Sequence, residues 1–195
     1  MSKAMYCALA GAVLLTACGG SVKEEDLTAA ISQNLAKKAP LCLGTASWPV
    51  DINEREQARQ QAVSNSSFAR MQALAGVGLV SVSDIEVDGM KDGKPDGSKL
   101  KARRYVLSDA AKPYLQPVTF TRHELSGQVD ETKNDLCWGK TALDKLGKWD
   151  TSKKGDQTEV VARYHYKIDG LVPWASNAAV QSAFPKLQTV IGAAG

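Results

Sequence analysis

The chain has 195 residues, of which 44% are hydrophobic, and 24 basic against 21 acidic side chains give it a net charge of +3. This composition excludes a disordered or collagen-like chain and a membrane protein with several apolar spans. The charge is too small for the concentrated basic face of a nucleic-acid-binding protein, so no nucleic-acid partner is predicted.

Residues 1–17 have the pattern of a secretory signal peptide. Lys3 precedes an apolar run from Ala4 to Ala17. As a helix this run would extend about 21 Å, which is too short for a hydrocarbon core of about 30 Å. A basic start, a short apolar centre and small residues before a cleavage point are typical of an exported protein, with a buried N-terminal core helix as the alternative.

The apolar run ends in Leu15-Thr16-Ala17-Cys18, followed by two glycines. This segment resembles the lipobox of bacterial lipoproteins. The resemblance implies cleavage before Cys18, acyl chains on its sulfur and amine, and anchoring by those chains, with residues 18–23 as a short tether. Gly19, where an acidic residue would imply retention at the inner membrane, implies the outer membrane, with the folded part on its periplasmic face or exposed at the surface.

The remaining cysteines fit an exported protein. Cys7 leaves with the signal peptide and Cys18 takes lipid, so Cys42 and Cys137 remain. Because the periplasm is oxidising, these two are predicted to form a disulfide, whose loop of about 95 residues would stabilise the fold by about 4.7 kcal/mol in the chain-entropy model. The alternative is a metal or redox pair, but neither cysteine belongs to a CxxC motif and no histidine lies nearby.

The first predicted element after the tether is a helix from Glu24 to Lys38. Its apolar residues Leu27, Ile31 and Leu35 recur at helical spacing. Acidic residues in the first turn and lysines in the last match the helix dipole, and Pro40 ends the helix.

The next part predicts two helices and two strands. The ranges are a helix from residue 51 or 53 to 63, a helix capped by Ser66 or Ser67, a strand over 76–87, a turn-rich loop over 88–98 and a strand over 101–107. This order resembles a winged-helix module over residues 51–115, with the loop as the wing. The first helix carries acidic residues beside Arg55 and Arg59, however, so the resemblance does not extend to a basic recognition helix.

The last third predicts an antiparallel sheet followed by a helix. Strands are expected over 118–125, 136–140 continuing through 143–149, and 158–168, with a polar turn at 151–156 and a helical segment from Pro173 to Phe184. In the strand over 158–168, Val160, Ala162, Tyr164, Tyr166 and Ile168 alternate onto the predicted core face. The predicted fold class is α+β, with a helical, winged-helix-like lobe over 24–116 and a sheet lobe over 117–195.

No residue of the sequence forms a recognisable catalytic motif. His123-Glu124 lacks the second histidine of a zinc-protease helix, and His165 falls on the polar face of its strand. Asp88, Asp92 and Asp96 lack the ligand spacing of a calcium loop. Gly76-Val77-Gly78 precedes a strand instead of a helix, which excludes a dinucleotide fingerprint. No catalytic residue, metal ligand or cofactor is therefore predicted.

Four tryptophans could form a binding platform, although core packing with a satisfied indole N–H is the commoner role. They are Trp48, Trp138, Trp149 and Trp174. The sequence favours a non-enzymatic binding or structural component of the bacterial envelope with an envelope protein as partner. A periplasmic hydrolase using carboxylates and a surface antigen or adhesin are the alternatives. A deep pocket with carboxyl groups of raised pKa would favour the hydrolase.

Overall fold

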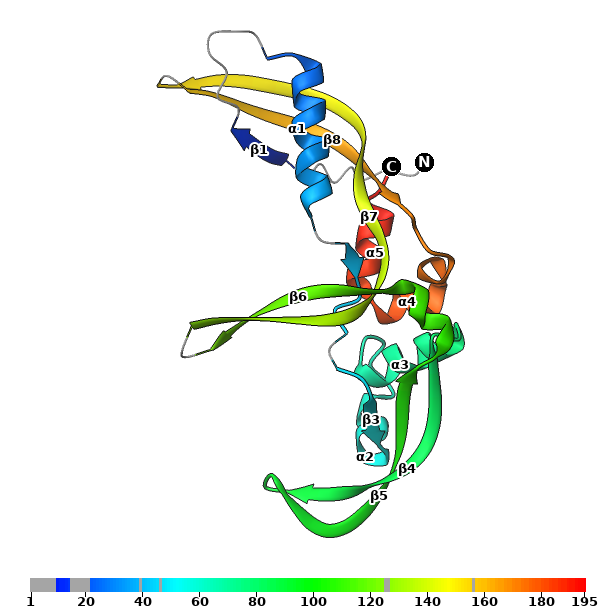
Figure 1. Cartoon of the computed structure of the whole chain (residues 1–195). Helices are drawn as coiled ribbons and strands as arrows, with labels where there is room; N and C mark the ends of the chain where they lie inside the picture. The colour runs from blue at the N-terminus through cyan, green and yellow to red at the C-terminus, as the bar shows by residue number, and fades with distance from the viewer. Residues whose placement is uncertain (1–9, 15–21, 39, 46, 125–126, 156) are drawn as a thin grey trace. The chain divides into compact units, whose positions relative to one another are not determined.

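The structure is a computed structural model that describes residues 10–14, 22–38, 40–45, 47–124, 127–155 and 157–195 (Figure 1). It contains helices and antiparallel strands, which confirms the α+β class. The chain divides into two compact units. Unit 1 comprises residues 1–41, 139–171 and 189–195, and unit 2 comprises 42–138 and 172–188. The boundary expected at residues 116–117 stays a prediction.

Unit 1 is built on the longest antiparallel pair of the chain. Strand β7 (Gly127–Lys154), from Lys140 onward, pairs with β8 (Gln157–Asp169). The other edge of β8 pairs with β1 (Ala10–Leu14). Two register shifts, between Leu143 and Lys145 and between Leu146 and Trp149, place extra residues in β7, which is the signature of β-bulges.

Helix α1 (Glu24–Lys37) provides the apolar side of unit 1. Leu27, Ile31 and Leu35 are buried, as their spacing predicts, and the helix ends close to the expected residue. Ile31 and Leu35 form a core cluster with Ala162 of β8, against which the side chains of Leu143, Leu146, Trp149 and Tyr164 pack.

The alternation predicted for β8 is confirmed. Val160, Ala162 and Tyr166 are buried and Tyr164 and Ile168 are half-buried. The residues that alternate with them, Val161, Arg163, His165 and Lys167, are exposed. The expected polar turn over 151–156 is shorter than predicted, because β7 continues to Lys154 and pairs with Gln157. The strands predicted over 136–140 and 143–149 are likewise parts of this single strand.

Unit 2 contains a small sheet with two helices at its start. Strand β3 (Val50–Asn53) leads into α2 (Glu54–Gln60), and α3 (Ser67–Gly76) follows, capped by the Ser66 side chain. The expected helix from 51–53 to 63 is therefore shorter, because its first residues pair as β3. The sheet order is β3-β5-β4, with β4 (Val80–Lys91) and β5 (Lys94–Leu107) as a long hairpin.

The expected loop over 88–98 is wrong, because these residues mostly continue the hairpin. Lys91 pairs with Lys94, which leaves a two-residue turn of Asp92 and Gly93. Both have positive φ, 51° and 77°, as a type I′ hairpin turn requires. A register shift between Asp88 and Met90 sets one residue of β4, Gly89, opposite residues 96–98 of β5, and so absorbs two extra residues of β5.

The remainder of unit 2 consists of a two-stranded ribbon and short helices. Strand β6 (Leu115–Glu124) follows the 3-10 helix η1 (Asp109–Tyr114) and pairs with the first part of β7. The predicted helical segment over 173–184 is two helices, η2 (Pro173–Ser176) and α4 (Ala178–Ala183). Helix α5 (Pro185–Gly192) was not predicted, because Pro185 begins a helix there instead of ending one.

Besides β7, two elements cross the boundary between the units. Helix α5 belongs to unit 2 up to Gln188 and to unit 1 from Thr189. In the short strand β2 (Leu41–Cys42), Leu41 belongs to unit 1 and Cys42 to unit 2.

Candidate functional site

The candidate site of unit 2 is a groove whose wall is α2. Asn53 caps this helix through a capping box: its side chain accepts a hydrogen bond from the Glu56 backbone N–H, and the Glu56 carboxylate accepts one from the Asn53 N–H. The Gln57 side chain donates to the Ile52 carbonyl at 3.0 Å. These bonds hold α2 directly beside the strand that precedes it.

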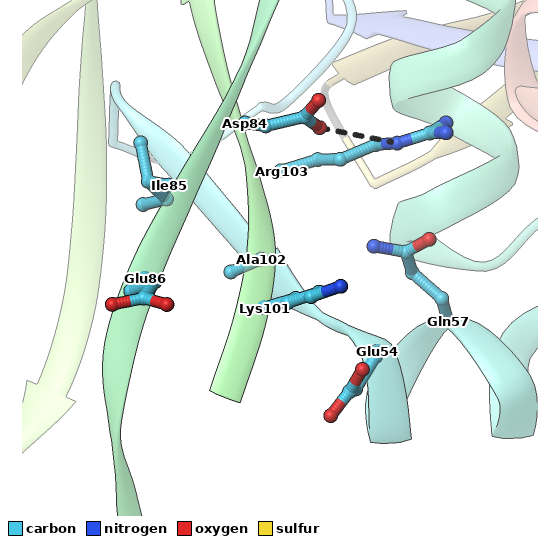
Figure 2. Close-up of a pocket in the computed structure, with 8 residues that line it drawn as sticks. All are labelled: Glu54, Gln57, Asp84, Ile85, Glu86, Lys101, Ala102 and Arg103. Atoms are coloured by element: carbon cyan, nitrogen blue, oxygen red, sulfur yellow. Dashed lines mark ion pairs between the residues drawn. The ribbon is translucent and has the colours of Figure 1, made fainter. Parts of the chain in front are cut away.

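The floor of the groove is formed by two neighbouring strands. Asp84 of β4 lies opposite Arg103 of β5, and Glu86 lies opposite Lys101. Figure 2 shows Lys101, Arg103 and Gln57 extending into the space between the strands and α2. The groove has a volume of about 640 Å³. Its lining is Glu54, Gln57, Asp84, Ile85, Glu86, Lys101, Ala102 and Arg103.

The groove carries charges of both signs. Three carboxylates face two cations, and the only ion pair drawn in Figure 2 joins Arg103 Nε to Asp84 Oδ1 at 4.0 Å. The lining contains no histidine, cysteine, serine or threonine. The arrangement therefore suits the binding of a polar ligand or peptide through hydrogen bonds and ion pairs.

A second groove of about 590 Å³ flanks α2, and its lining includes Arg55, Arg59, Asp88 and Met90. Nearby, the Arg104 guanidinium donates from Nε and Nη2 to both carboxylate oxygens of Asp51, at 2.8 and 2.7 Å. This hydrogen-bonded pair joins β5 to β3 and holds the pKa of Asp51 below its usual value. Such two-point contacts are the most geometrically specific form of an ion pair.

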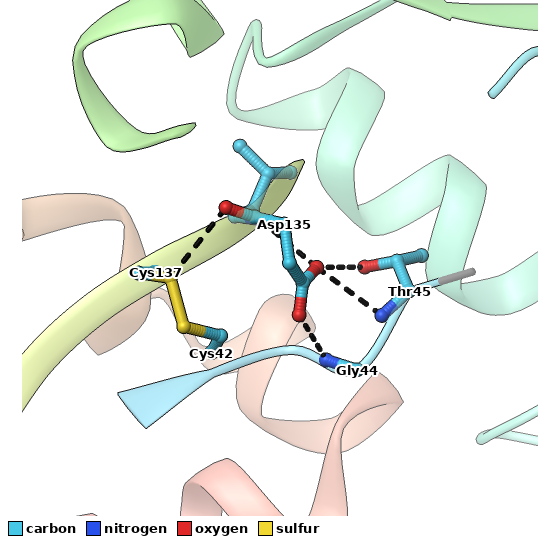
Figure 3. Close-up of a disulfide and its surroundings, with 6 residues drawn as sticks. Cys42, Gly44, Thr45, Asp135 and Cys137 are labelled. Carbon is cyan, nitrogen blue, oxygen red and sulfur yellow. Dashed lines mark hydrogen bonds between the residues drawn. A yellow bond between two sulfur atoms is a disulfide. The ribbon is translucent and has the colours of Figure 1, made fainter. Parts of the chain in front are cut away.

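Cys42 and Cys137 form a disulfide within unit 2, with an S–S distance of 1.96 Å, as the sequence predicts (Figure 3). Beside it lies a carboxylate that sequence analysis missed. Asp135 is 1% exposed and accepts hydrogen bonds from the Gly44 N–H at 2.7 Å, the Thr45 N–H and hydroxyl at 3.2 Å, and the Leu136 N–H at 2.9 Å. The sequence signal that could have indicated this buried carboxylate is the position of Asp135 directly before the apolar run Leu136-Cys137-Trp138.

Asp135 therefore has a structural role. Both of its carboxylate oxygens accept hydrogen bonds, and burying a charge is tolerated only when it is satisfied in this way. These bonds tie residues 44–45 to the strand that carries Cys137, so the carboxylate and the disulfide hold the same two segments together.

The histidines and the aspartate series do not gather into a site. His123 is exposed in β6, and exposed His165 contacts the Gly195 carbonyl through Nδ1 at 3.1 Å. Asp88 pairs with Lys99, and Asp96 accepts hydrogen bonds from the Ser98 N–H and hydroxyl, which lower its pKa. Within the described ranges no group of three or more histidine, cysteine or carboxylate side chains is placed to hold a metal ion.

The tryptophans differ from the expectation of satisfied indole groups. The Nε1 atoms of Trp48, Trp138 and Trp174 are buried with no hydrogen-bond acceptor among the described residues. Trp174 packs its ring edge against Tyr114, with 5.9 Å between the ring centroids. Trp149 packs against the core cluster of unit 1. These contacts are those of packing residues, not of an exposed aromatic platform.

The predicted signal peptide and lipidation residue are not part of the candidate site. The lipidation residue Cys18, with Lys3 and Cys7, lies outside the described residues. None of the helices that the structure describes is long and apolar enough to cross a membrane. Comparison with protein-family models, with curated proteins and with solved structures finds no match for this chain.

Proposed function

We propose that the chain is a membrane-anchored lipoprotein of the bacterial envelope that acts by binding an envelope component, without catalysing a reaction. The observation that carries the proposal is the lipobox-like segment Leu15-Thr16-Ala17-Cys18 directly after a short apolar run. The Cys42–Cys137 disulfide supports it, because such bonds persist in oxidising compartments such as the periplasm. Gly19 supports a place at the outer membrane.

In this proposal the groove beside α2 is the binding surface of unit 2. Its lining offers charges of both signs and no hydroxyl, thiol or imidazole group, which favours recognition of a charged or polar partner. The hydrolase alternative needs a carboxyl group whose pKa is raised by its pocket. Among the described side chains, the carboxyl groups with a shifted pKa are Asp51, Asp96 and Asp109, whose pKa values are lowered by hydrogen bonds from Arg104, Ser98 and Lys112 respectively, and none of the three lines the groove.

The winged-helix-like module over residues 51–115 remains part of this proposal. The element order β3, α2, α3, β4, β5 and the sheet order β3-β5-β4 support it. Nucleic acid is not the proposed partner. The only basic residue of α3 is Arg70, whose guanidinium lies over the Phe184 ring and donates to the Ala183 carbonyl, so it is engaged within unit 2.

Metabolic labelling with a palmitate analogue tests the anchor. The wild-type chain and the Cys7→Ala variant, a matched control in the same apolar segment, are expected to take up label in the membrane fraction. The Cys18→Ala variant is expected to take up none, because the thiol that receives the first acyl chains is gone. An unlabelled wild-type chain, or label that persists in Cys18→Ala, would refute the lipoprotein proposal.

A further inference from the structure

The edge of β8 that faces away from β7 is paired with two other segments of the chain. Strand β1 lies beside β8 (Figure 1). It pairs with Glu159–Arg163, in the register that places Ala12 opposite Val161. Further along the same edge, the Gly195 backbone N–H donates to the Tyr166 carbonyl at 3.0 Å. Successive residues of a strand direct their backbone N–H and C=O groups to opposite edges. Val160, Ala162 and Tyr164 therefore direct these groups to the same edge as Tyr166.

Processing of the proposed lipoprotein would remove β1, because residues 10–14 precede Cys18. The backbone groups of β8 between its turn with β7 and the Gly195 contact would then have no partner. This open segment runs from Thr158 to Tyr164, and its middle residue is Val161, whose side chain is 41% exposed. The β7–β8 pair would then be the whole sheet of unit 1 beside α1 and residues 189–195, and an unprotected edge of this kind is a template for strand pairing.

We propose that the edge opened by signal-peptide removal pairs with the same edge of a second copy of this chain. The inference rests on the proposed function, because only the processed chain lacks β1. An antiparallel pairing centred on Val161 places Val161 opposite its own copy. It also places Glu159 opposite Arg163 of the other copy, twice by symmetry, and Val160 opposite Ala162.

The charges and the burial pattern both fit this register. Glu159 and Arg163 lie on the same face of β8 as exposed Val161, so the two cross-strand pairs join opposite charges. Val160 and Ala162 lie on the core face in each copy, so the apolar layers would be continuous. The Gly195 contact at Tyr166 and the β7–β8 turn block the ends of the open segment and fix the register.

Disulfide trapping in cells tests the pairing with the full-length gene. A Val161→Cys variant is expected to form a covalent dimer under non-reducing conditions, because residues opposite each other in a non-hydrogen-bonded pair approach within disulfide range. Val63→Cys is the matched control, since Val63 is also an exposed valine, at 48%, and lies in unit 2. The control is expected to stay monomeric.

Charge reversal tests the register in the Val161→Cys background. Glu159→Arg alone and Arg163→Glu alone each place like charges opposite one another, and each is expected to lower the cross-linked fraction about tenfold. Co-expression of the two variants restores both opposite-charge pairs and is expected to restore the cross-link. This rescue also shows that both variants fold.

Three outcomes would overturn the inference: a processed chain with no more Val161→Cys dimer than the control, reversals that change nothing, or a cross-link to a different polypeptide. The mass of the extracted chain separates this failure from that of the proposed function. A chain that retains residues 1–17 refutes the lipoprotein. A processed chain without the cross-link refutes only the pairing.

Discussion

Asp135 shows how a single buried charge can organise a surface loop. Its carboxylate accepts hydrogen bonds from backbone groups of Gly44, Thr45 and Leu136 at 2.7–3.2 Å, beside the disulfide. The carboxylates of the groove differ from Asp135, because they lie at the surface beside the cations of Lys101 and Arg103. Burial therefore separates a residue that holds the fold from residues that are free to meet a ligand.

Replacement of Asp135 measures this role. Asp135→Ala leaves buried backbone N–H groups without acceptors and is expected to lower the free energy of unfolding by about 3 kcal/mol, whereas Asp135→Asn keeps one acceptor and is expected to cost less. Denaturant unfolding with the disulfide oxidised gives both values. Asp144→Ala, which removes an exposed carboxylate of β7, is the control and should change stability by less than about 0.5 kcal/mol. Equal effects of Asp135→Ala and Asp144→Ala would contradict the structural role.

At the scale of elements, the β4–β5 hairpin carries one side of the groove, and its end is a tight turn. Asp92 and Gly93 both have positive φ, which matches the twist that a two-residue connection needs. The hairpin reaches beyond Asp88, so the charged residues of its outer part belong to paired strands and not to a loose loop.

Two glycine substitutions test the turn. Gly93→Ala forces a side chain into a left-handed conformation, at φ 77°, and is expected to destabilise the protein by about 1 kcal/mol. Gly76→Ala is the matched control: Gly76 lies in α3, an added Cβ meets no atom within 4 Å, and stability should rise by about 0.5 kcal/mol. Thermal unfolding of both variants is the measurement. Stabilisation by Gly93→Ala would refute the assigned turn.

Sequence periodicity predicted the elements that have a buried face of their own. Helix α1 and strand β8 follow the expected spacing closely, because the residues on one face of each are buried, and Ile31 and Leu35 of the helix share a core cluster with Ala162 of the strand. Sequence periodicity did not predict the segments whose structure depends on contacts with residues distant in the chain. The outer part of the hairpin forms by pairing across the turn, and Pro185 begins a helix whose existence depends on tertiary packing.

The site was predictable only in its covalent part. Cys42 and Cys137 could be paired by elimination, since Cys7 lies in the predicted signal peptide and Cys18 is the predicted lipidation residue. The groove could not be predicted, because Glu54 and Gln57 come from a helix and Lys101 and Arg103 from a strand more than forty positions later. Nothing in the spacing of these residues indicates that they meet.

At the scale of the whole molecule, the account joins export, anchoring and assembly in one order of events. In the proposed order, the segment that contains β1 would direct export and then be removed, the new N-terminal cysteine would carry lipid, and the uncovered edge of β8 would pair with a second copy. Each step depends on the one before it, so the position at which the mature chain begins is the central claim.

The most direct test is the intact mass of the chain extracted from bacterial membranes with detergent. The account predicts a polypeptide that begins at Cys18, contains the 178 residues from Cys18 to Gly195, and carries additional mass for the acyl groups on its first residue. Fragmentation should place that added mass on Cys18. A chain that still begins at residue 1, or a processed chain with no added lipid mass, would contradict it.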